Sequence, residues 1–142
     1  MDRIALDTTF LIDLQNERRQ RGQVRGATKF LESHRDTELL LPAVALGESL
    51  EGFSDPSSPA ARALVDPLEV LEVTAAVAHT YAVTLRHLRS AGLLIGTNDL
   101  WIGCTARAAD LSLLTRNPEH FLRIPGLQVL SYSSQPSGRR AP

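Results

Sequence analysis

Short apolar segments alternate with helical patterns along most of this chain, and this alternation limits the possible folds. The first apolar segment, residues 3–6, is followed by Phe10, Leu11 and Leu14, which recur at helical spacing. Strands that alternate with helices in this way favour a parallel sheet covered on both faces, because each crossover runs through a helix. We therefore predict an α/β fold.

The rest of the chain continues the alternation. Further strands are predicted at 38–44, 111–115 and 127–130, and residues 68–73 fit a strand or an extended edge segment. Helices are predicted at 27–34, around 46–53, at 60–64, from Thr74 to Gly92, from Asp99 to 109, and at 118–122. The Arg-rich segment 16–26 is expected to be the end of one helix and a mobile connection. We expect residues 1–130 to form a single domain and residues 131–142 to be a flexible tail.

Four polar residues stand at the edges of apolar segments: Asp7, Glu48, Asp99 and Asn117. Ligands in open α/β sheets bind beyond the carboxyl ends of the strands. Asp7, Glu48 and Asn117 follow strand candidates, and Asp99 opens a helix, so all four can face one crevice. Clustered carboxylates repel one another, and a hard divalent cation removes that repulsion. The pattern indicates a metal-dependent hydrolase that acts on phosphates.

Each of these residues also has a simpler interpretation. Asp7 and Asp99 can cap helices, a role that Asp commonly takes. Glu48 can lie on a solvated helix face, and Asn117 before Pro118 is typical of a turn. The four positions taken together favour a site.

Composition excludes several classes of protein. The chain has 142 residues, enough for one domain, and a net charge of -1, so no global field attracts nucleic acid. The lone Cys104 excludes an internal disulfide and is expected to pack as a small hydrophobe. With neither a signal-peptide pattern nor a long apolar span, the expected location is the cytoplasm. The cations are almost all Arg, which suits phosphate but equally fits a bias in genomic base composition.

Four short segments occur in a fixed order: residues 6–13 (LDTTFLID), 46–52 (LGESLEG), 98–103 (NDLWIG) and 114–121 (LTRNPEHF), the last followed by IPGL at 124–127. Together they resemble the PIN-domain family, and VapC-type toxins in particular. Each motif is short, but all of them occur in the family's order between residues 3 and 130. The resemblance implies a three-layer α/β/α fold with a central parallel sheet.

The resemblance also implies a function. It implies a magnesium-dependent ribonuclease, with manganese as a plausible substitute, acting as the toxin of a toxin–antitoxin pair. The expected partners are a cognate antitoxin, an RNA substrate such as a structured tRNA, and a second copy of the chain. The matching positions make Asp7, Glu48 and Asp99 the acidic metal ligands, with Thr9 and Thr115 in support. Cleavage would leave a 5′-phosphate and a 3′-hydroxyl.

Two positions depart from the family pattern. Asn117 stands where many PIN domains carry a fourth acid, so it offers an oxygen without a charge. Our hypothesis is that one ion binds firmly before the RNA arrives and that substrate phosphate recruits a second. Gly103 and Cys104 replace a common pair of alanines, which is read as a change between small residues.

RNA needs positive groups near the acidic pocket, because phosphate contacts dominate affinity. The candidates are Arg18, Arg19, Arg21, Arg25, Arg86, Arg89 and Arg116, although any one of them can be a solvated surface residue. Trp101 is expected in the core rather than as a stacking platform, and Asp13 on a solvated helix face. The apolar helix faces can form a groove for a partner helix, or can be ordinary core.

Two rival functions remain open at this point. A DNA nuclease or a phosphatase would use the same pocket, and assays with RNA, DNA and a phosphomonoester separate these activities. A catalytically weak module that binds RNA or a partner is the alternative from another class, with Asn117 as the mark of a decayed site.

Overall fold

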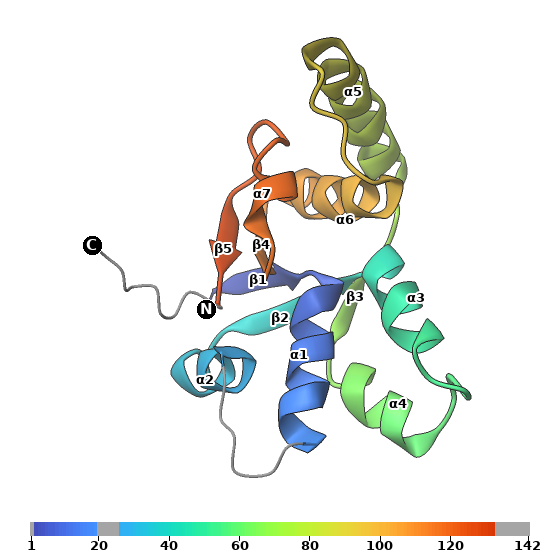
Figure 1. Cartoon of the computed structure of the whole chain (residues 1–142), viewed down its shortest axis with the longest axis vertical. Coiled ribbons are helices and arrows are strands. Elements are labelled where there is room, and N and C mark those ends of the chain that lie inside the picture. Colours follow the sequence, from blue (N-terminus) through green and yellow to red (C-terminus); the bar gives the residue numbers. More distant parts are fainter. Residues whose placement is uncertain (1, 20–25, 133–142) are drawn as a thin grey trace.

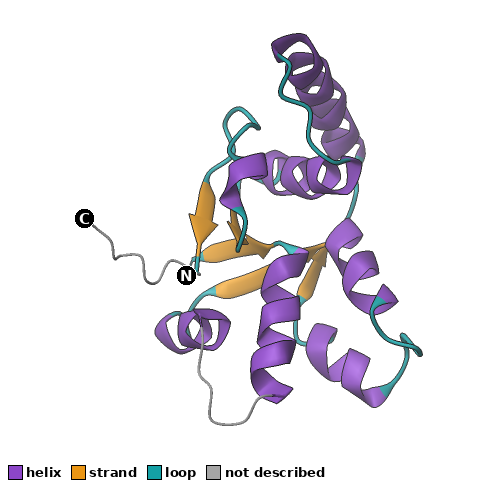
Figure 2. Ribbon diagram, viewed as in Figure 1, coloured by secondary structure: helices purple, strands orange, loops and turns teal. Residues whose placement is uncertain are grey.

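The computed structural model describes residues 2–19 and 26–132. Within these residues, five parallel strands form one sheet in the order β3-β2-β1-β4-β5 (Figures 1 and 2). The strands are β1 (Arg3–Leu6), β2 (Glu38–Pro42), β3 (Glu69–Leu71), β4 (Ser112–Thr115) and β5 (Val129–Ser131). The predicted α/β class with a parallel sheet is confirmed.

The three central strands are apolar runs rather than alternating patterns. Ala5, Leu40 and Leu113 are fully buried, as are the residues that follow each of them, Leu6, Leu41 and Leu114. A parallel sheet covered on both faces produces this pattern. β1 pairs with β2 on one side and with β4 on the other. The strand order reverses between β1 and β4, which is where a crevice opens in α/β sheets.

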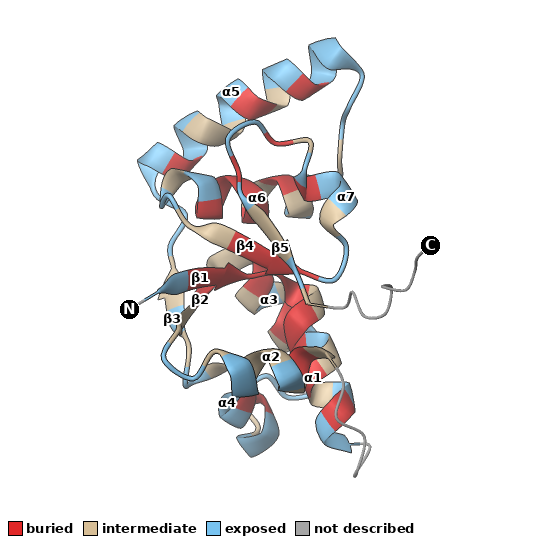
Figure 3. Cartoon of the chain, turned by 90° about the vertical axis from the view of Figure 1, so that its left-hand side faces the viewer, coloured by how far each residue is buried: buried red, intermediate tan, exposed pale blue. Residues whose placement is uncertain are grey.

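Helices cover both faces of the sheet. They are α1 (Thr8–Arg19), α2 (Gly26–Ser33), α3 (Ala43–Glu51), α4 (Pro59–Val65), α5 (Ala75–Ala91), α6 (Thr97–Ala108) and α7 (Pro118–Phe121). Figure 3 shows α1, α2 and α4 on one side of the sheet and α5 and α6 on the other. The three-layer arrangement that the sequence led us to expect is confirmed. None of the helices in the described ranges is long and apolar enough to cross a membrane.

The long helix α5 begins and ends as predicted. The Thr74 hydroxyl accepts a hydrogen bond from the Val77 backbone at 3.2 Å, and Gly92 ends the helix with a left-handed φ of 71°. Trp101 of α6 stacks on Tyr81 of α5 with ring centroids 3.7 Å apart. Trp101 therefore fixes one helix against the other, which agrees with its expected core role.

Three element boundaries differ from the prediction. β2 ends at Pro42, and α3 begins at once with Ala43, so Glu48 lies on a helix and does not directly follow a strand. A short apolar run fits either structure, and here the helical spacing of Leu46 and Leu50 prevails. Asp99 is not a helix cap, because α6 begins at Thr97 after Gly96.

The carboxyl end of the sheet extends beyond the expected domain boundary. Ser131 ends β5 and pairs with Thr115, and Tyr132 packs edge-on against Phe10 at a centroid distance of 5.1 Å. The remainder of the expected tail, residues 133–142, lies outside the described residues, as does 20–25 of the expected connection. Cys104 is buried, and burial raises the pKa of its thiol, in keeping with a packing role.

Candidate active site

An open cleft of about 1070 Å³ lies beyond the carboxyl ends of β1 and β4. Asp7, Glu48, Asp99 and Asn117 all line it, although they are far apart in the sequence. The switch in strand order brings Asp7 and Asn117 together, and α3 and α6 supply Glu48 and Asp99. The expectation that the four residues face one crevice is therefore met by the geometry.

Asp7 is the most tightly held of the four. It follows β1 directly, and its side chain is buried, with only 4% exposed. The hydroxyls of Thr9 and Thr115 each donate to its Oδ2 at 2.8 Å, and the Thr8 backbone donates to Oδ1 at 2.8 Å. Thr9 and Thr115 thus contact the carboxylate that the resemblance implied they support. A carboxylate has about four acceptor positions, so one remains on Oδ1.

Glu48 reaches the cleft from the second turn of α3. The Thr8 hydroxyl donates to its Oε1 at 2.5 Å, and the Asn98 amide donates to its Oε2 at 3.0 Å. Thr8 therefore connects two carboxylates, since its backbone binds Asp7 and its hydroxyl binds Glu48. Donors to both oxygens orient the Glu48 carboxylate, which lines the open cleft.

Asp99 lies in the first turn of α6, with its side chain 35% exposed. Burial, together with the nearby negative charges of Asp7 and Glu48, raises its pKa. His120 lies on the other side, with its Nδ1 3.5 Å from the Asp99 Oδ2, and partly offsets this effect. The pKa of Asp99 is thus raised mainly by burial, and the charges of Asp7 and Glu48 add to this effect.

Asn117 takes the residue position immediately before α7. Its backbone N–H donates to the Thr115 hydroxyl at 3.0 Å, and its side chain makes no capping hydrogen bond to α7. The side chain is exposed to the cleft. Asn117 therefore offers a neutral amide oxygen at the edge of the acidic group.

The donor chemistry of the cleft fits a hard divalent cation, which prefers carboxylate and carbonyl oxygens. No three His, Cys, Asp or Glu side chains among the described residues stand close enough to hold an ion by themselves. Magnesium keeps several of its waters and binds through few direct carboxylates. The residues present therefore fit an ion held partly through its own water molecules.

Sequence reasoning missed three contributors to this site: Thr8, Asn98 and His120. All three stand within the motifs quoted above, but the motifs by themselves give them no role. The sequence did offer a hint of their involvement, because each is a polar residue within three positions of a predicted site residue in the same motif. Their partners, however, come from other elements, as for Thr8 and Glu48, which are 40 positions apart.

The candidate RNA-binding arginines are spread over the molecule. Arg116 lines the cleft, whereas Arg18 and Arg19 are exposed at the end of α1. Arg86 and Arg89 are exposed on α5, and Arg21 and Arg25 lie outside the described residues. Arg116 forms an ion pair with Asp13 at 2.6 Å. The Asp13 side chain is only 18% exposed, so its expected place on a solvated face is wrong.

The PIN domain family matches residues 4–127 of this chain. The chain belongs to the PIN domain family. Ribonuclease VapC4 of Mycobacterium tuberculosis is 32% identical over 95 residues, which cover 62% of this chain and 72% of that protein. Ribonuclease VapC1 of Rickettsia felis is 44% identical over 57 residues, which cover 40% of this chain and 42% of that protein. The match to VapC1 thus spans less than half of its length. The predicted resemblance to PIN-domain VapC proteins is confirmed.

Solved structures show the same fold. The VapBC2 structure from Rickettsia felis, bound to a promoter DNA fragment, superposes with a TM-score of 0.75 at 24% identity and covers 92% of this chain and 98% of that one. FitAcB from Neisseria gonorrhoeae superposes with a TM-score of 0.66 at 20% identity. The match covers 89% of this chain and 96% of that one. At these identities the likeness concerns the fold, and it confirms the PIN-like α/β architecture.

Proposed function

We propose that this PIN-domain protein is a magnesium-dependent endoribonuclease and the toxin of a toxin–antitoxin pair. The observation that carries the proposal is the meeting of Asp7, Glu48 and Asp99 in one open cleft. The raised pKa of Asp99, caused first by burial and then by the charges of Asp7 and Glu48, supports it, since a bound cation would offset both effects. The similarity to VapC ribonucleases supports the choice of RNA over other phosphate esters.

The side chains of the cleft have different proposed roles, which follow from how each one is held. Asp7, fixed by its three donors, and the more exposed Asp99 would hold magnesium and its waters. For Glu48, anchored by Thr8 and Asn98, we propose the role of accepting a proton from the water that attacks the phosphate. When bound, the ion would offset the charge that develops on the phosphate oxygens. We expect products with a 5′-phosphate and a 3′-hydroxyl.

Asn117 sets the charge of the proposed site. Three carboxylates supply three negative charges, fewer than the four positive charges of two magnesium ions. With a neutral amide in the fourth position, we propose one firmly held ion before RNA binds. A phosphate of the substrate would complete the site for a second ion.

A cognate antitoxin is the proposed protein partner. One structure with this fold is described as a toxin–antitoxin complex from Klebsiella pneumoniae, and another as a member of the VapBC family of toxin–antitoxin systems from Mycobacterium tuberculosis. In this chain a pocket of about 390 Å³ lies beside α1, α2 and α4. Phe10, Leu11, Leu14 and Leu64, which line it, are buried in the core, so the proposal of an antitoxin partner rests on the related structures. We also propose a homodimer, and the cytoplasm, where RNA is found, as the place of action.

The decisive experiment measures cleavage by the purified chain. Single-stranded RNA, single-stranded DNA and a small phosphomonoester are incubated with magnesium, with manganese, and with a chelator. We expect metal-dependent cleavage of RNA, and its loss in the Asp7→Asn and Asp99→Asn variants. Preferred cleavage of DNA or of the phosphomonoester would favour one of the rival enzymes. RNA binding without any cleavage would favour the binding module.

A second test follows the proposed toxin role in cells. Expression of the chain should arrest bacterial growth, and the Asp7→Ala variant at the same protein level should not. Equal arrest by both forms would contradict a toxic effect that depends on cleavage.

A further inference from the structure

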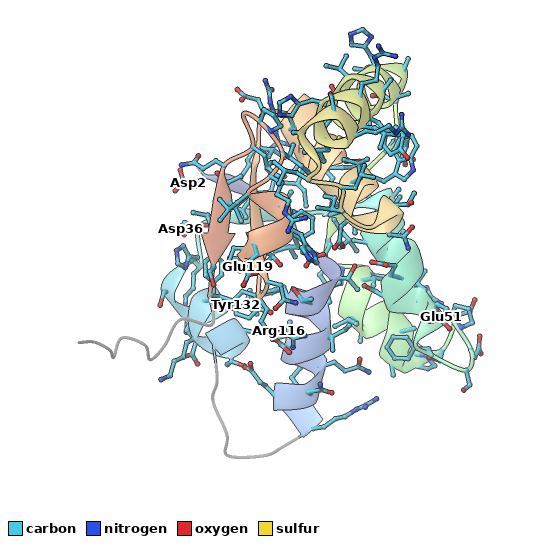
Figure 4. The ribbon with its side chains drawn as sticks, turned by 45° about the horizontal axis from the view of Figure 1, so that its top comes forward. Asp2, Asp36, Glu51, Arg116, Glu119 and Tyr132 are labelled. Atoms are coloured by element: carbon cyan, nitrogen blue, oxygen red, sulfur yellow. The ribbon has the colours of Figure 1, made fainter. Side chains whose placement is uncertain are left out.

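Asp13 of α1 holds two side chains that come from other elements. Its Oδ1 lies 2.6 Å from the Arg116 Nη1, and its Oδ2 accepts a hydrogen bond from the Tyr132 hydroxyl at 2.6 Å. Arg116 follows β4 and Tyr132 follows β5, and Figure 4 shows these two labelled residues close together beside α1. Each carboxylate oxygen of Asp13 thus has its own donor, which fixes the carboxylate plane.

Tyr132 anchors this arrangement in the core. Its ring packs edge-on against Phe10, with an interplanar angle of 84°. Burial and the hydrogen bond to Asp13 raise the pKa of Tyr132 far above its usual value. The hydroxyl therefore stays protonated and donates to Asp13 over the whole physiological pH range.

Arg116 connects this cluster to the catalytic cleft. Its backbone N–H donates to the Thr9 hydroxyl at 3.1 Å, and Thr9 in turn donates to Asp7. Its side chain lines the cleft and remains 43% exposed. A guanidinium has about five N–H donors. The contact with Asp13 engages Nη1, so most of the donor set stays available to a ligand.

The cleft needs such a cation. Its walls carry Asp7, Glu48, Asp99 and also Glu51 and Glu119, and an RNA strand that enters brings further negative charge. Among the described residues that line the cleft, Arg116 is the one with a permanent positive charge. A free arginine here would fold onto the carboxylates and neutralise the groups that attract a metal ion. The ion pair with Asp13 holds it to one side.

We propose that Asp13 and Tyr132 are positioning residues that hold Arg116 as the phosphate-binding side chain for RNA entering the cleft. This inference rests on the proposed ribonuclease function and adds a substrate contact to it. The guanidinium binds a phosphate next to the scissile one, and Asp13 and Tyr132 act only through Arg116. The end of β5 thereby becomes part of the substrate site.

The first test compares kinetic constants on a short single-stranded RNA. Arg116→Ala should raise KM by roughly ten- to a hundredfold, the loss expected for a charged hydrogen bond, with little change in kcat. Asp13→Asn and Tyr132→Phe should raise KM by about three- to tenfold, since they disturb the arginine without removing it. Arg116→Lys should recover part of the loss. A fall in kcat with unchanged KM would overturn the inference.

A double-mutant cycle separates positioning from a structural role. In the Arg116→Ala background, Asp13→Asn should raise KM no further, because the residue that it positions is gone. If the KM of the double variant rises by the product of the two single effects, Asp13 acts independently of Arg116 and the inference is overturned. Arg62 of α4 and Asp66, the residue after α4, form an exposed Arg–Asp pair outside the cleft, so Arg62→Ala and Asp66→Asn serve as matched controls with unchanged KM.

RNA binding in the presence of a chelator distinguishes this inference from the proposed function. Arg116→Ala should weaken binding of the same labelled RNA and reduce the slope of log affinity against log salt by about 0.7, the value for one phosphate contact on a single strand. If the chain binds RNA through Arg116 but never cleaves it, the proposed ribonuclease fails and the contact stands. If it cleaves RNA and Arg116→Ala changes neither KM nor the salt slope, the inference alone fails. If it neither cleaves nor binds RNA, both fail.

Discussion

Threonine hydroxyls hold two of the cleft carboxylates in place. Thr9 and Thr115 donate to Asp7, and Thr8 donates to Glu48. A hydroxyl orients a carboxylate and stabilises its charged form without cancelling its charge. The cleft therefore keeps an ordered set of negative charges that a cation can use.

The Thr115 hydroxyl should contribute measurably to stability. Thr115→Val leaves the buried Asp7 without one donor and should lower the free energy of unfolding by about 1.5–3 kcal/mol, as expected for a hydrogen bond to a charged group. Urea denaturation measures the change. Thr105→Val is the matched control, because the buried Thr105 hydroxyl donates to the neutral Trp101 carbonyl at 2.7 Å. Thr105→Val should lower the free energy of unfolding by only about 0.5–1.5 kcal/mol and leave RNA cleavage unchanged.

Asp99 should make stability depend on pH and on metal. Its pKa is raised from 3.8, so the folded chain binds this proton more readily than the unfolded chain does. Stability therefore falls as the pH rises from 3.8 through the raised pKa, and the loss persists at neutral pH. Asp99→Asn should raise the melting temperature in chelator by a few degrees and remove the stabilisation that magnesium gives the unmodified chain.

Thermal melts with and without magnesium test this expectation. Asp66→Asn removes an exposed carboxylate outside the cleft and serves as the control. It should neither raise the melting temperature in chelator nor alter the response to magnesium. A melting temperature of Asp99→Asn that rises with magnesium as much as that of the unmodified chain would contradict the role of Asp99.

At the scale of elements, close packing sets the position of α7 against α6. A Cβ at Gly103 of α6 would contact the end of the Ile124 side chain and lie 3.3 Å from Phe121 of α7. Ile124 is 2% exposed, so it has little room to move. The change between small residues that the sequence indicated therefore carries a packing requirement, because an alanine at Gly103 fits only if the end of Ile124 shifts. This packing also places Asn117 and His120, which flank α7 or lie on it.

Gly103→Ala should destabilise the fold modestly. Overpacking costs about 1–3 kcal/mol, and the better helix propensity of alanine returns about 1 kcal/mol. We expect a net loss of up to about 2 kcal/mol in denaturant unfolding. Ile124→Val removes the contacting methyl group, so the double variant should be more stable than Gly103→Ala alone. A double variant that is less stable than both single variants would contradict this explanation.

At the scale of the whole molecule, the strand order β3-β2-β1-β4-β5 creates the site. It places the ends of β1 and β4 side by side, where Asp7 and Thr115 meet although they are 108 positions apart. α3 and α6 then bring Glu48 and Asp99 to the same opening. The chain thus assembles its charged cleft only when the whole sheet has formed.

The number of bound ions should follow the charge of the assembled site. Calorimetric titration of the RNA-free chain with magnesium should show one site, and Asn117→Asp should add a second or tighten the first. Asn16→Asp, on the exposed face of α1, adds the same charge outside the cleft and should have no such effect. Two magnesium sites of equal affinity in the unmodified chain would contradict the one-ion hypothesis.

The sequence by itself determined the elements and the type of chemistry. The strands at 3–6 and 112–115 could be predicted from the short apolar runs Ile4–Leu6 and Leu113–Leu114, which are typical of a parallel sheet covered on both faces. Thr74 and Gly92 bound α5 because capping and a left-handed φ are local properties. Asp7 and Asp99 could be singled out because acids next to buried elements are rarely needed for packing.

Only the tertiary structure decided which side chains hold one another. Thr8 donates a hydrogen bond to Glu48, and Arg116 donates one to Asp13, which is 103 positions away. The order of the strands brings these residues together. Gly103 became a packing requirement only when Ile124 was placed against it. A local sequence pattern indicates the periodicity and the secondary-structure propensity of one segment. These contacts depend instead on the distances between elements, which are set by the packing of the helices on the sheet.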